Sequence, residues 1–225
     1  MIVLPGGGYA VHAPHEAEPV AEWLGEIGVQ ASVFRYPLNV RHPVPLDALR
    51  AEIGWRRADG ATRIGLIGFS AGGHLAGLAA LSPGAARDQS VQFAVLGYAI
   101  TSMETETYRP ARLILLGADA SSQLRRSTSL DSLVTPQSPP FFIWHTAEDS
   151  YVAPEHTYRL GAALAASGVP HALHMFAHGP HSLGLARDAG EAAVWTTLAA
   201  AWIREQAQDQ RCEAAPLQEP APPRG

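Results

Sequence analysis

Gly68-Phe69-Ser70-Ala71-Gly72 is the stretch that decides the fold, because it places a serine between two glycines at a turn from strand to helix. Residues 63–67 before it are short and apolar, as in a buried strand, and residues 73–81 after it are typical of a helix. A serine in the pattern G-x-S-x-G at such a turn indicates a nucleophile elbow, whose strained backbone lifts the hydroxyl above the sheet. The pattern alone occurs by chance in roughly one chain in ten of this size, so the rest of the chain has to supply its partners.

Strand-like and helix-like segments alternate along the whole chain. Strands are predicted at residues 1–4, 31–36, 63–67, 91–98, 141–145 and 171–176, and helices at 18–27, 45–57, 73–81, 154–167 and 191–204. This alternation predicts an α/β fold with a mostly parallel sheet covered by helices on both faces. Ligands bind such sheets at the carboxyl ends of the strands. We therefore expect the functional residues in the loops that directly follow strands.

The glycine-rich run Pro5-Gly6-Gly7-Gly8-Tyr9 follows the first predicted strand. Three consecutive glycines allow the backbone to turn its N–H groups toward a shared point, where they can stabilise an anion. Alone, this run could be a plain flexible turn. With a serine elbow in the same chain, an oxyanion-hole loop explains it better. His12 and His15 flank the loop and could line the pocket.

A serine hydroxyl needs a base, and a histidine is suited to this because its unperturbed pKa is about 6.5. His74 lies on the helix that begins at the elbow and is expected to pack beneath it. His171 and His174 lie on the last strand and point to opposite faces of the sheet. His178 and His181 lie in the loop beyond, where a side chain can reach over the strand ends. We choose His181 as the base, with His178 as the alternative.

The histidine in turn needs an acid that fixes its tautomer and stabilises the imidazolium. Asp149 follows the preceding strand, so it should be a neighbour of His181, whereas the adjacent Glu148 is expected to be solvated. Asp119 and Asp131 fall away from the strand ends. The chain order Ser, Asp, His is the one expected for this architecture.

Composition and charge exclude several other classes of function. Hydrophobic residues make up 47% and charged residues 16% of the chain, as in a globular protein. The net charge of −5 and the absence of a Lys/Arg cluster argue against nucleic acid as a partner. No apolar run approaches the roughly 20 residues that cross a membrane, no secretory leader is visible, and the single Cys212 cannot form an internal disulfide. We expect a cytoplasmic protein without nucleic-acid or membrane partners.

The expected domain organisation is one α/β domain over residues 1–204. Residues 101–140 follow no single period and predict a small helical excursion over the mouth of the site, because a disordered loop of that length is unusual inside a domain. Residues 205–225 are polar and proline-rich, which predicts a mobile tail.

Four motifs together resemble those of α/β-hydrolase-fold esterases. They are residues 5–9, residues 68–75, residues 139–154 with His145 and Asp149, and residues 176–185 with Gly179 and His181. The likeness is greatest to bacterial acetyl-xylan esterases and bifunctional feruloyl/acetyl esterases, and it runs from Met1 to about Arg204.

This resemblance implies a role for each motif. Ser70 would be the nucleophile, His181 the base and Asp149 its orienting acid. The N–H groups of Gly7, Gly8 and Ala71 would form the oxyanion hole. Tyr9 and His12, beside that loop, are expected to contact the substrate.

The sequence departs from this family in three places. The antiparallel strand pair that normally precedes the oxyanion strand is not seen, so either the sheet is trimmed and has an exposed edge, or upstream sequence is missing. Ser182 replaces a glycine that is common after the catalytic histidine, and Ala99 replaces a proline that is common after Tyr98. Both changes could reshape the acyl pocket.

The expected function is that of a serine carboxylesterase that removes short acyl groups, acetyl first, from acetylated sugars such as xylan fragments. No metal or organic cofactor is implied, and the oligomeric state stays open, a dimer included. A feruloyl esterase and a peptidase or amidase on the same fold are the alternatives. A metal site made of His171, His174, His178 and His181 is disfavoured because the strand scatters these side chains. A complete triad with an oxyanion loop argues against a non-catalytic binding module.

Overall fold

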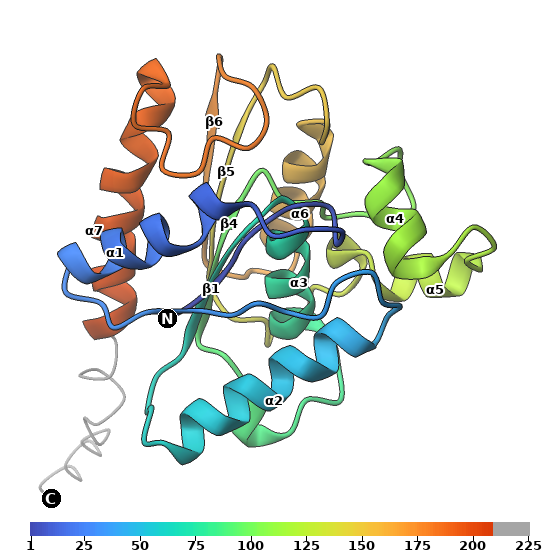
Figure 1. The fold of residues 1–225 in the computed structure, drawn as a ribbon, viewed down its shortest axis with the longest axis horizontal. Helices are drawn as coiled ribbons and strands as arrows, with labels where there is room; N and C mark the ends of the chain where they lie inside the picture. Colours follow the sequence, from blue (N-terminus) through green and yellow to red (C-terminus); the bar gives the residue numbers. More distant parts are fainter. Residues whose placement is uncertain (209–225) are drawn as a thin grey trace, which may run out of the picture.

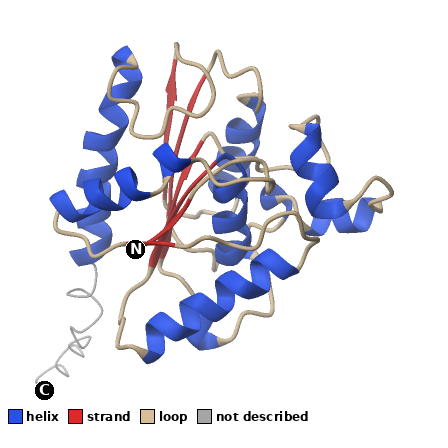
Figure 2. Ribbon diagram, viewed as in Figure 1, coloured by secondary structure: helices blue, strands red, loops and turns tan. Residues whose placement is uncertain are grey.

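A single parallel sheet forms the centre of the molecule in this computed structural model, which describes residues 1–208. The strand order is β2-β1-β3-β4-β5-β6, and every pairing is parallel. The strands are β1 (Ile2–Leu4), β2 (Ser32–Val33), β3 (Gly65–Phe69), β4 (Phe93–Gly97), β5 (Phe141–Thr146) and β6 (His171–Phe176). Figure 2 shows them gathered between the helices. The predicted α/β fold is confirmed.

Helices cover both faces of the sheet (Figure 1). The first face carries α1 (Glu18–Glu26) and α7 (Trp195–Gln208), and the second carries α2 (Val44–Ala58), α3 (Ser70–Leu81) and α6 (Glu155–Ala166). Successive strand residues alternate between the two cores, as pleating requires. In β5, Phe141 and Ile143 pack against the second group of helices, whereas Phe142 and Trp144 pack against the first.

Residues 101–140, where the sequence predicts a helical excursion, contain α4 (Arg109–Leu116), α5 (Ser122–Ser127) and the short 3-10 helix η3 (Leu130–Ser132). Two buried histidines attach this segment to the domain. His156 Nδ1 accepts the backbone N–H groups of Thr101 and Ser102, at 3.0 and 3.1 Å. His74 Nε2 donates to the carbonyl of Thr128 at 2.8 Å. The excursion is therefore held next to α3, the helix that begins at Ser70.

Several predicted boundaries differ from those of the structure, and two of the differences have a clear cause. The helix α7 continues to Gln208 rather than ending at Arg204, because Glu205, Gln206 and Ala207 favour helix. The start of the predicted tail is thus helical, and residues 209–225 lie outside the described residues. The strand β2 covers only two of the six predicted residues, since its sole partner β1 ends before Pro5, which has no N–H to extend the ladder.

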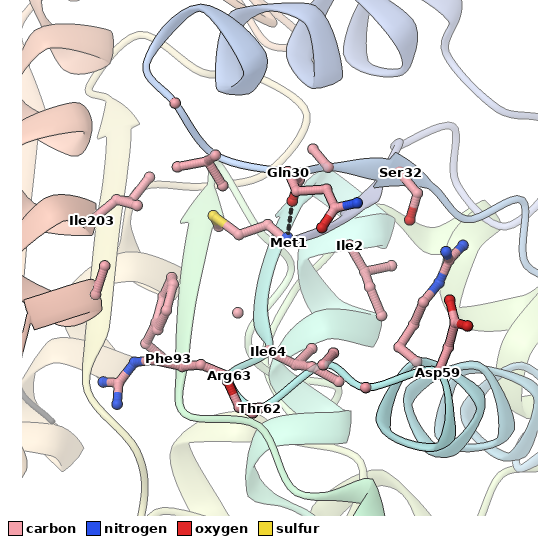
Figure 3. Close-up of a pocket in the computed structure, with 18 residues that line it drawn as sticks. Met1, Ile2, Gln30, Ser32, Asp59, Thr62, Arg63, Ile64, Phe93 and Ile203 are labelled. Carbon is pink, nitrogen blue, oxygen red and sulfur yellow. Dashed lines mark hydrogen bonds between the residues drawn. The ribbon is translucent and has the colours of Figure 1, made fainter.

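A hollow of about 550 Å³ lies at the end of the sheet where the strands begin (Figure 3). Met1, Ile2, Ile64 and Phe93, at the starts of three strands, contribute to its lining. It lies at the opposite end of the strands from the loops in which the candidate catalytic residues are expected. This hollow is therefore separate from the candidate active site, which lies at the carboxyl ends of the strands.

Candidate active site

Ser70 sits at the sharp junction of β3 and α3. Its φ is +50°, in the left-handed region that residues with a side chain rarely adopt. A Cβ atom at Gly68 would lie 2.4 Å from the carbonyl oxygen of Gly72, and one at Gly72 would lie 2.2 Å from that of Leu4. Both positions therefore require glycine, and the strained turn presents the serine at the carboxyl end of the sheet.

A continuous chain of hydrogen bonds starts at this serine. The hydroxyl of Ser70 lies 2.9 Å from His181 Nε2, and His181 Nδ1 lies 2.6 Å from Asp149 Oδ2. With Nδ1–H donating to the carboxylate, Nε2 is left as the acceptor for the serine proton. The structure thus brings together a side chain from the junction of β3 and α3 and two side chains from the loops after β5 and β6.

Asp149 is buried and fully satisfied by donors. Its Oδ1 accepts the N–H groups of Tyr151 and Val152, each at 2.9 Å, and its Oδ2 accepts His145 Nε2 at 2.9 Å as well as His181. Burial alone would raise the pKa of Asp149, but the hydrogen bonds from His145 and His181 outweigh it and hold the pKa far below its usual value. Asp149 is therefore ionised beside the imidazole.

His145 is a member of this group that the sequence reasoning did not assign. It lies on β5, four residues before Asp149, and its Nδ1 lies 2.8 Å from the hydroxyl of Thr157. Because that hydroxyl can donate to Nδ1, Nε2 carries the proton that goes to Asp149. The sequence feature that could have identified His145 is its position four residues before Asp149, near the end of a strand.

The glycine loop after β1 folds back on itself. Gly7 and Gly8 have φ values of +119° and +64°, and the carbonyl of Gly7 accepts the N–H groups of Ala10 and Val11. A Cβ atom at Gly7 would lie 2.2 Å from the carbonyl oxygen of Val11. Within residues 1–208, the N–H groups of Gly7, Gly8 and Ala71 have no acceptor. The loop and the start of α3 thus offer unpaired donors for an anion.

The expectation that Tyr9 contacts substrate is wrong. Its side chain has no exposed surface, and its hydroxyl donates to His74 Nδ1 at 2.7 Å. With φ at +63°, the backbone turns the ring into the core, edge-on to Tyr36. His74 is likewise buried beneath the elbow, where burial lowers its pKa to about 4. His12 is half-buried and packs edge-on against Tyr36, so its contact with substrate stays a prediction.

His178, the alternative base, lies in solvent. Its side chain is 77% exposed, and its Nδ1 is 3.0 Å from Glu148 Oε1. This carboxylate raises the pKa of His178 through their hydrogen bond. Among the described residues, the imidazole that is hydrogen-bonded to the Ser70 hydroxyl is that of His181 and not that of His178.

Two tyrosines that the sequence reasoning did not assign lie beside the relay. The ring of Tyr151 is 5.7 Å from that of His181, and the ring of Tyr108 is 5.8 Å from that of Tyr151. A Cβ atom at Gly8 would lie 3.2 Å from Tyr108 Cε1. We call Tyr108 and Tyr151 the aromatic rim, because they extend from the oxyanion loop to the histidine. Tyr108 belongs to the excursion, and no motif marks it.

The four histidines of the last strand and its loop have separate partners. His171 Nδ1 bonds the carbonyl of Val169, His174 packs on Phe142, and His178 pairs with Glu148. In the described part of the chain, no three His, Cys, Asp or Glu side chains gather as metal ligands would. No helix within residues 1–208 combines the length and apolar character that a membrane span needs.

The chain is similar to known proteins in sequence and in fold. The family model BD-FAE matches residues 58–164. The crystal structure of an acetyl ester-xyloside bifunctional hydrolase from Caldicellulosiruptor lactoaceticus is 35% identical, with a TM-score of 0.86 over 92% of this chain and 82% of that one. Carboxylesterase Cest-2923 from Lactobacillus plantarum WCFS1 is 31% identical, with a TM-score of 0.78 over 92% and 85% of the two chains.

Fold, site and relatives define the class: this is a carboxylic ester hydrolase of the α/β-hydrolase fold. Within that class, the chain is similar to the BD-FAE family, whose model matches residues 58–164. The endo-1,4-beta-xylanase B of Butyrivibrio fibrisolvens is 29% identical over 84% of this chain and 33% of its own length. The chain spans between 23% and 41% of the lengths of the curated relatives that it matches.

Proposed function

We propose that this protein hydrolyses short-chain acyl esters, acetyl first, through Ser70, His181 and Asp149. The observation that carries the proposal is the unbroken relay from the Ser70 hydroxyl to the Asp149 carboxylate, at 2.9 and 2.6 Å. The unpaired N–H groups of Gly7 and Gly8 support it, since acyl transfer needs donors where the carbonyl oxygen becomes negative.

In this proposal the reaction proceeds in two halves. His181 Nε2 takes the proton of Ser70 as the oxygen attacks the ester carbonyl, and the N–H groups of Gly7, Gly8 and Ala71 stabilise the oxyanion. His181 then protonates the leaving alcohol, which frees an acyl-enzyme on Ser70. In the second half, His181 takes a proton from water as the hydroxide attacks the acyl carbon, then returns that proton to the departing Ser70 oxygen, and the acid leaves. Asp149 holds the imidazole and stabilises its charged form throughout.

The substrate class is proposed from the relatives and from the aromatic rim. The C. lactoaceticus relative is named for acetyl esters and xylosides, which supports acetylated sugars such as xylan fragments. Tyr108 lies directly against the oxyanion-loop glycine Gly8. A long acyl chain that approached from that side would meet its ring.

A panel of aryl esters of rising chain length tests the acyl preference. We expect kcat/KM on acetate to exceed that on octanoate by at least about tenfold, because a few unaccommodated methylenes cost this much. Acetylated xylo-oligosaccharides should be substrates in the same panel. Equal rates on acetate and octanoate would contradict the short-chain assignment, and cleavage of a peptide panel would favour the amidase alternative.

Feruloyl ester hydrolysis is a second candidate, and the aromatic rim favours it. Tyr151 is 59% exposed beside His181, so its ring is free to pack against a sugar or a ferulate. Methyl ferulate in the same panel decides between acetyl ester and feruloyl ester hydrolysis. A higher kcat/KM on methyl ferulate than on acetylated xylo-oligosaccharides would reverse the order of the two candidates.

Replacing Tyr151 tests the role of the rim. In Tyr151→Ala, we expect KM for acetylated xylo-oligosaccharides to rise about three- to tenfold, because one aromatic contact is lost. The increase should be smaller on aryl acetate, whose alcohol is smaller. Tyr158→Ala is the matched control, since Tyr158 is similarly exposed, at 52%, and within residues 1–208 its ring does not pack against His181. Equal effects of the two substitutions would show that the aromatic rim does not bind the substrate.

A further inference from the structure

Glu16 places a carboxylate where such groups are rare. Its side chain is fully buried, at the end of the short 3-10 helix η1 (Pro14–Glu16), between the oxyanion loop and α1. Carboxylates are seldom fully buried unless they are paired or hydrogen-bonded, because losing their hydration is costly. The proposed mechanism does not use Glu16, so its burial needs another explanation.

Donors from three separate segments converge on this carboxylate. The N–H of Gly6, in the oxyanion loop, donates to Oε2 at 2.7 Å. The hydroxyls of Tyr98, after β4, and of Ser182, next to His181, donate to Oε1 at 2.8 and 2.7 Å. Tyr98 also accepts the N–H of Gly184 at 2.8 Å, which obliges its own proton to point at Glu16. Ser182 and Gly184 both belong to the loop that carries His181.

These contacts fit the ionised form of Glu16. Gly6 N–H can only donate, and Tyr98 and Ser182 already donate, so a protonated carboxyl would leave two donors facing each other. Burial alone would raise the pKa of Glu16, but the nearby imidazole of His15 and the hydrogen bonds from Ser182, Tyr98 and Gly6 outweigh it and lower the pKa below its usual value. His15 Nε2, at 3.6 Å, is the other titratable group facing this carboxylate.

The contact with Gly6 reaches the oxyanion loop and the elbow together. A Cβ atom at Gly6 would lie 2.6 Å from Glu16 Oε2 and 3.0 Å from Ser70 Cβ. Gly6 is thus wedged between the carboxylate and the nucleophilic turn. With its N–H held by Glu16, Gly6 fixes the path of the backbone into Gly7 and Gly8, whose N–H groups have no acceptor in the described part of the chain.

The contact with Ser182 reaches the histidine loop. Ser182 has φ at +67°, a conformation that side chains disfavour, and its hydroxyl both donates to Glu16 and lies 3.1 Å from His15 Nε2. The hydroxyl of Ser182 is thus directed at Glu16, and an effect of this residue on the acyl pocket stays a prediction. A serine here adds a tether that a glycine could not supply.

We infer that Glu16 is a positioning residue: its carboxylate ties the oxyanion loop and the loop of His181 to one point, and so sets the spacing between the anion-stabilising N–H groups and the general base. The inference rests on the proposed function of Ser70 and His181. Both loops act on the transition state more than on bound substrate, so loosening them should reduce kcat and leave KM nearly unchanged.

The test compares Glu16→Gln with wild type on aryl acetate, with kcat expressed per site titrated by a fluorophosphonate. Glutamine has the same shape but places an NH₂ group against one of the donors, so at least one tether is lost. We expect kcat per titrated site to fall about 10- to 100-fold, with KM changed by less than about threefold. Glu18→Gln, the same substitution on an exposed, ion-paired residue nearby, should stay within about twofold of wild type.

Ser182→Ala keeps the test usable if Glu16→Gln does not fold. It removes one donor to Glu16 and should reduce kcat about three- to tenfold. If Glu16→Gln does fold, adding Ser182→Ala to it should reduce kcat little further, because both changes loosen the same link. Wild-type kcat per titrated site in either variant, a loss confined to KM, or losses that multiply independently would overturn the inference. If wild type and Ser70→Ala were equally inactive, the proposed function would fail instead.

Discussion

Ser70→Ala is expected to lose kcat on aryl acetate by roughly 10⁴-fold or more, because the hydroxyl that would form the acyl-enzyme is gone. The residual rate would come from the N–H groups of Gly7 and Gly8, which still polarise a bound ester. Initial rates with a chromogenic acetate, compared with the uncatalysed hydrolysis, measure both quantities. Since Ser70 is 7% exposed and alanine is smaller, the variant should fold normally, which thermal unfolding would verify. Retention of more than about a tenth of the wild-type kcat would contradict the role of Ser70.

His181→Ala is expected to have an effect of similar size, about 10⁴-fold in kcat, since no other imidazole is hydrogen-bonded to Ser70 within residues 1–208. The chain supplies a matched control three residues away. His178 is bonded to Glu148 in solvent, so His178→Ala should remain within about threefold of wild type. The reverse outcome, an inactive His178→Ala and an active His181→Ala, would reassign the base.

The juxtaposition of Ser70, Asp149 and His181 could be anticipated because a rule links sequence to space. Each residue lies just after the carboxyl end of a strand, at the turn after β3 or in the loops after β5 and β6, and these ends meet at one edge of the sheet. The glycines could be interpreted for a similar reason. Where two backbone segments approach closely, only glycine fits, as the contacts of Gly68 and Gly72 demonstrate.

Glu16 could not be anticipated because its burial depends on partners far along the chain. Ser182, one of its donors, is 166 residues away, and a glutamate in a polar segment is normally expected at the surface. Tyr9 was misjudged for a different reason. Its neighbours in the sequence belong to the oxyanion loop, but a positive φ turns its ring away from that loop and into the core.

The central claim, that Ser70 is a nucleophile activated by His181, is tested most directly by covalent labelling. A fluorophosphonate should add one phosphonyl group to wild-type protein, and peptide mass spectrometry should locate it on Ser70. Labelling should be absent in Ser70→Ala and strongly slowed in His181→Ala, because the hydroxyl is no longer deprotonated as it attacks. A label on any other residue, or an unlabelled wild-type protein, would contradict the account.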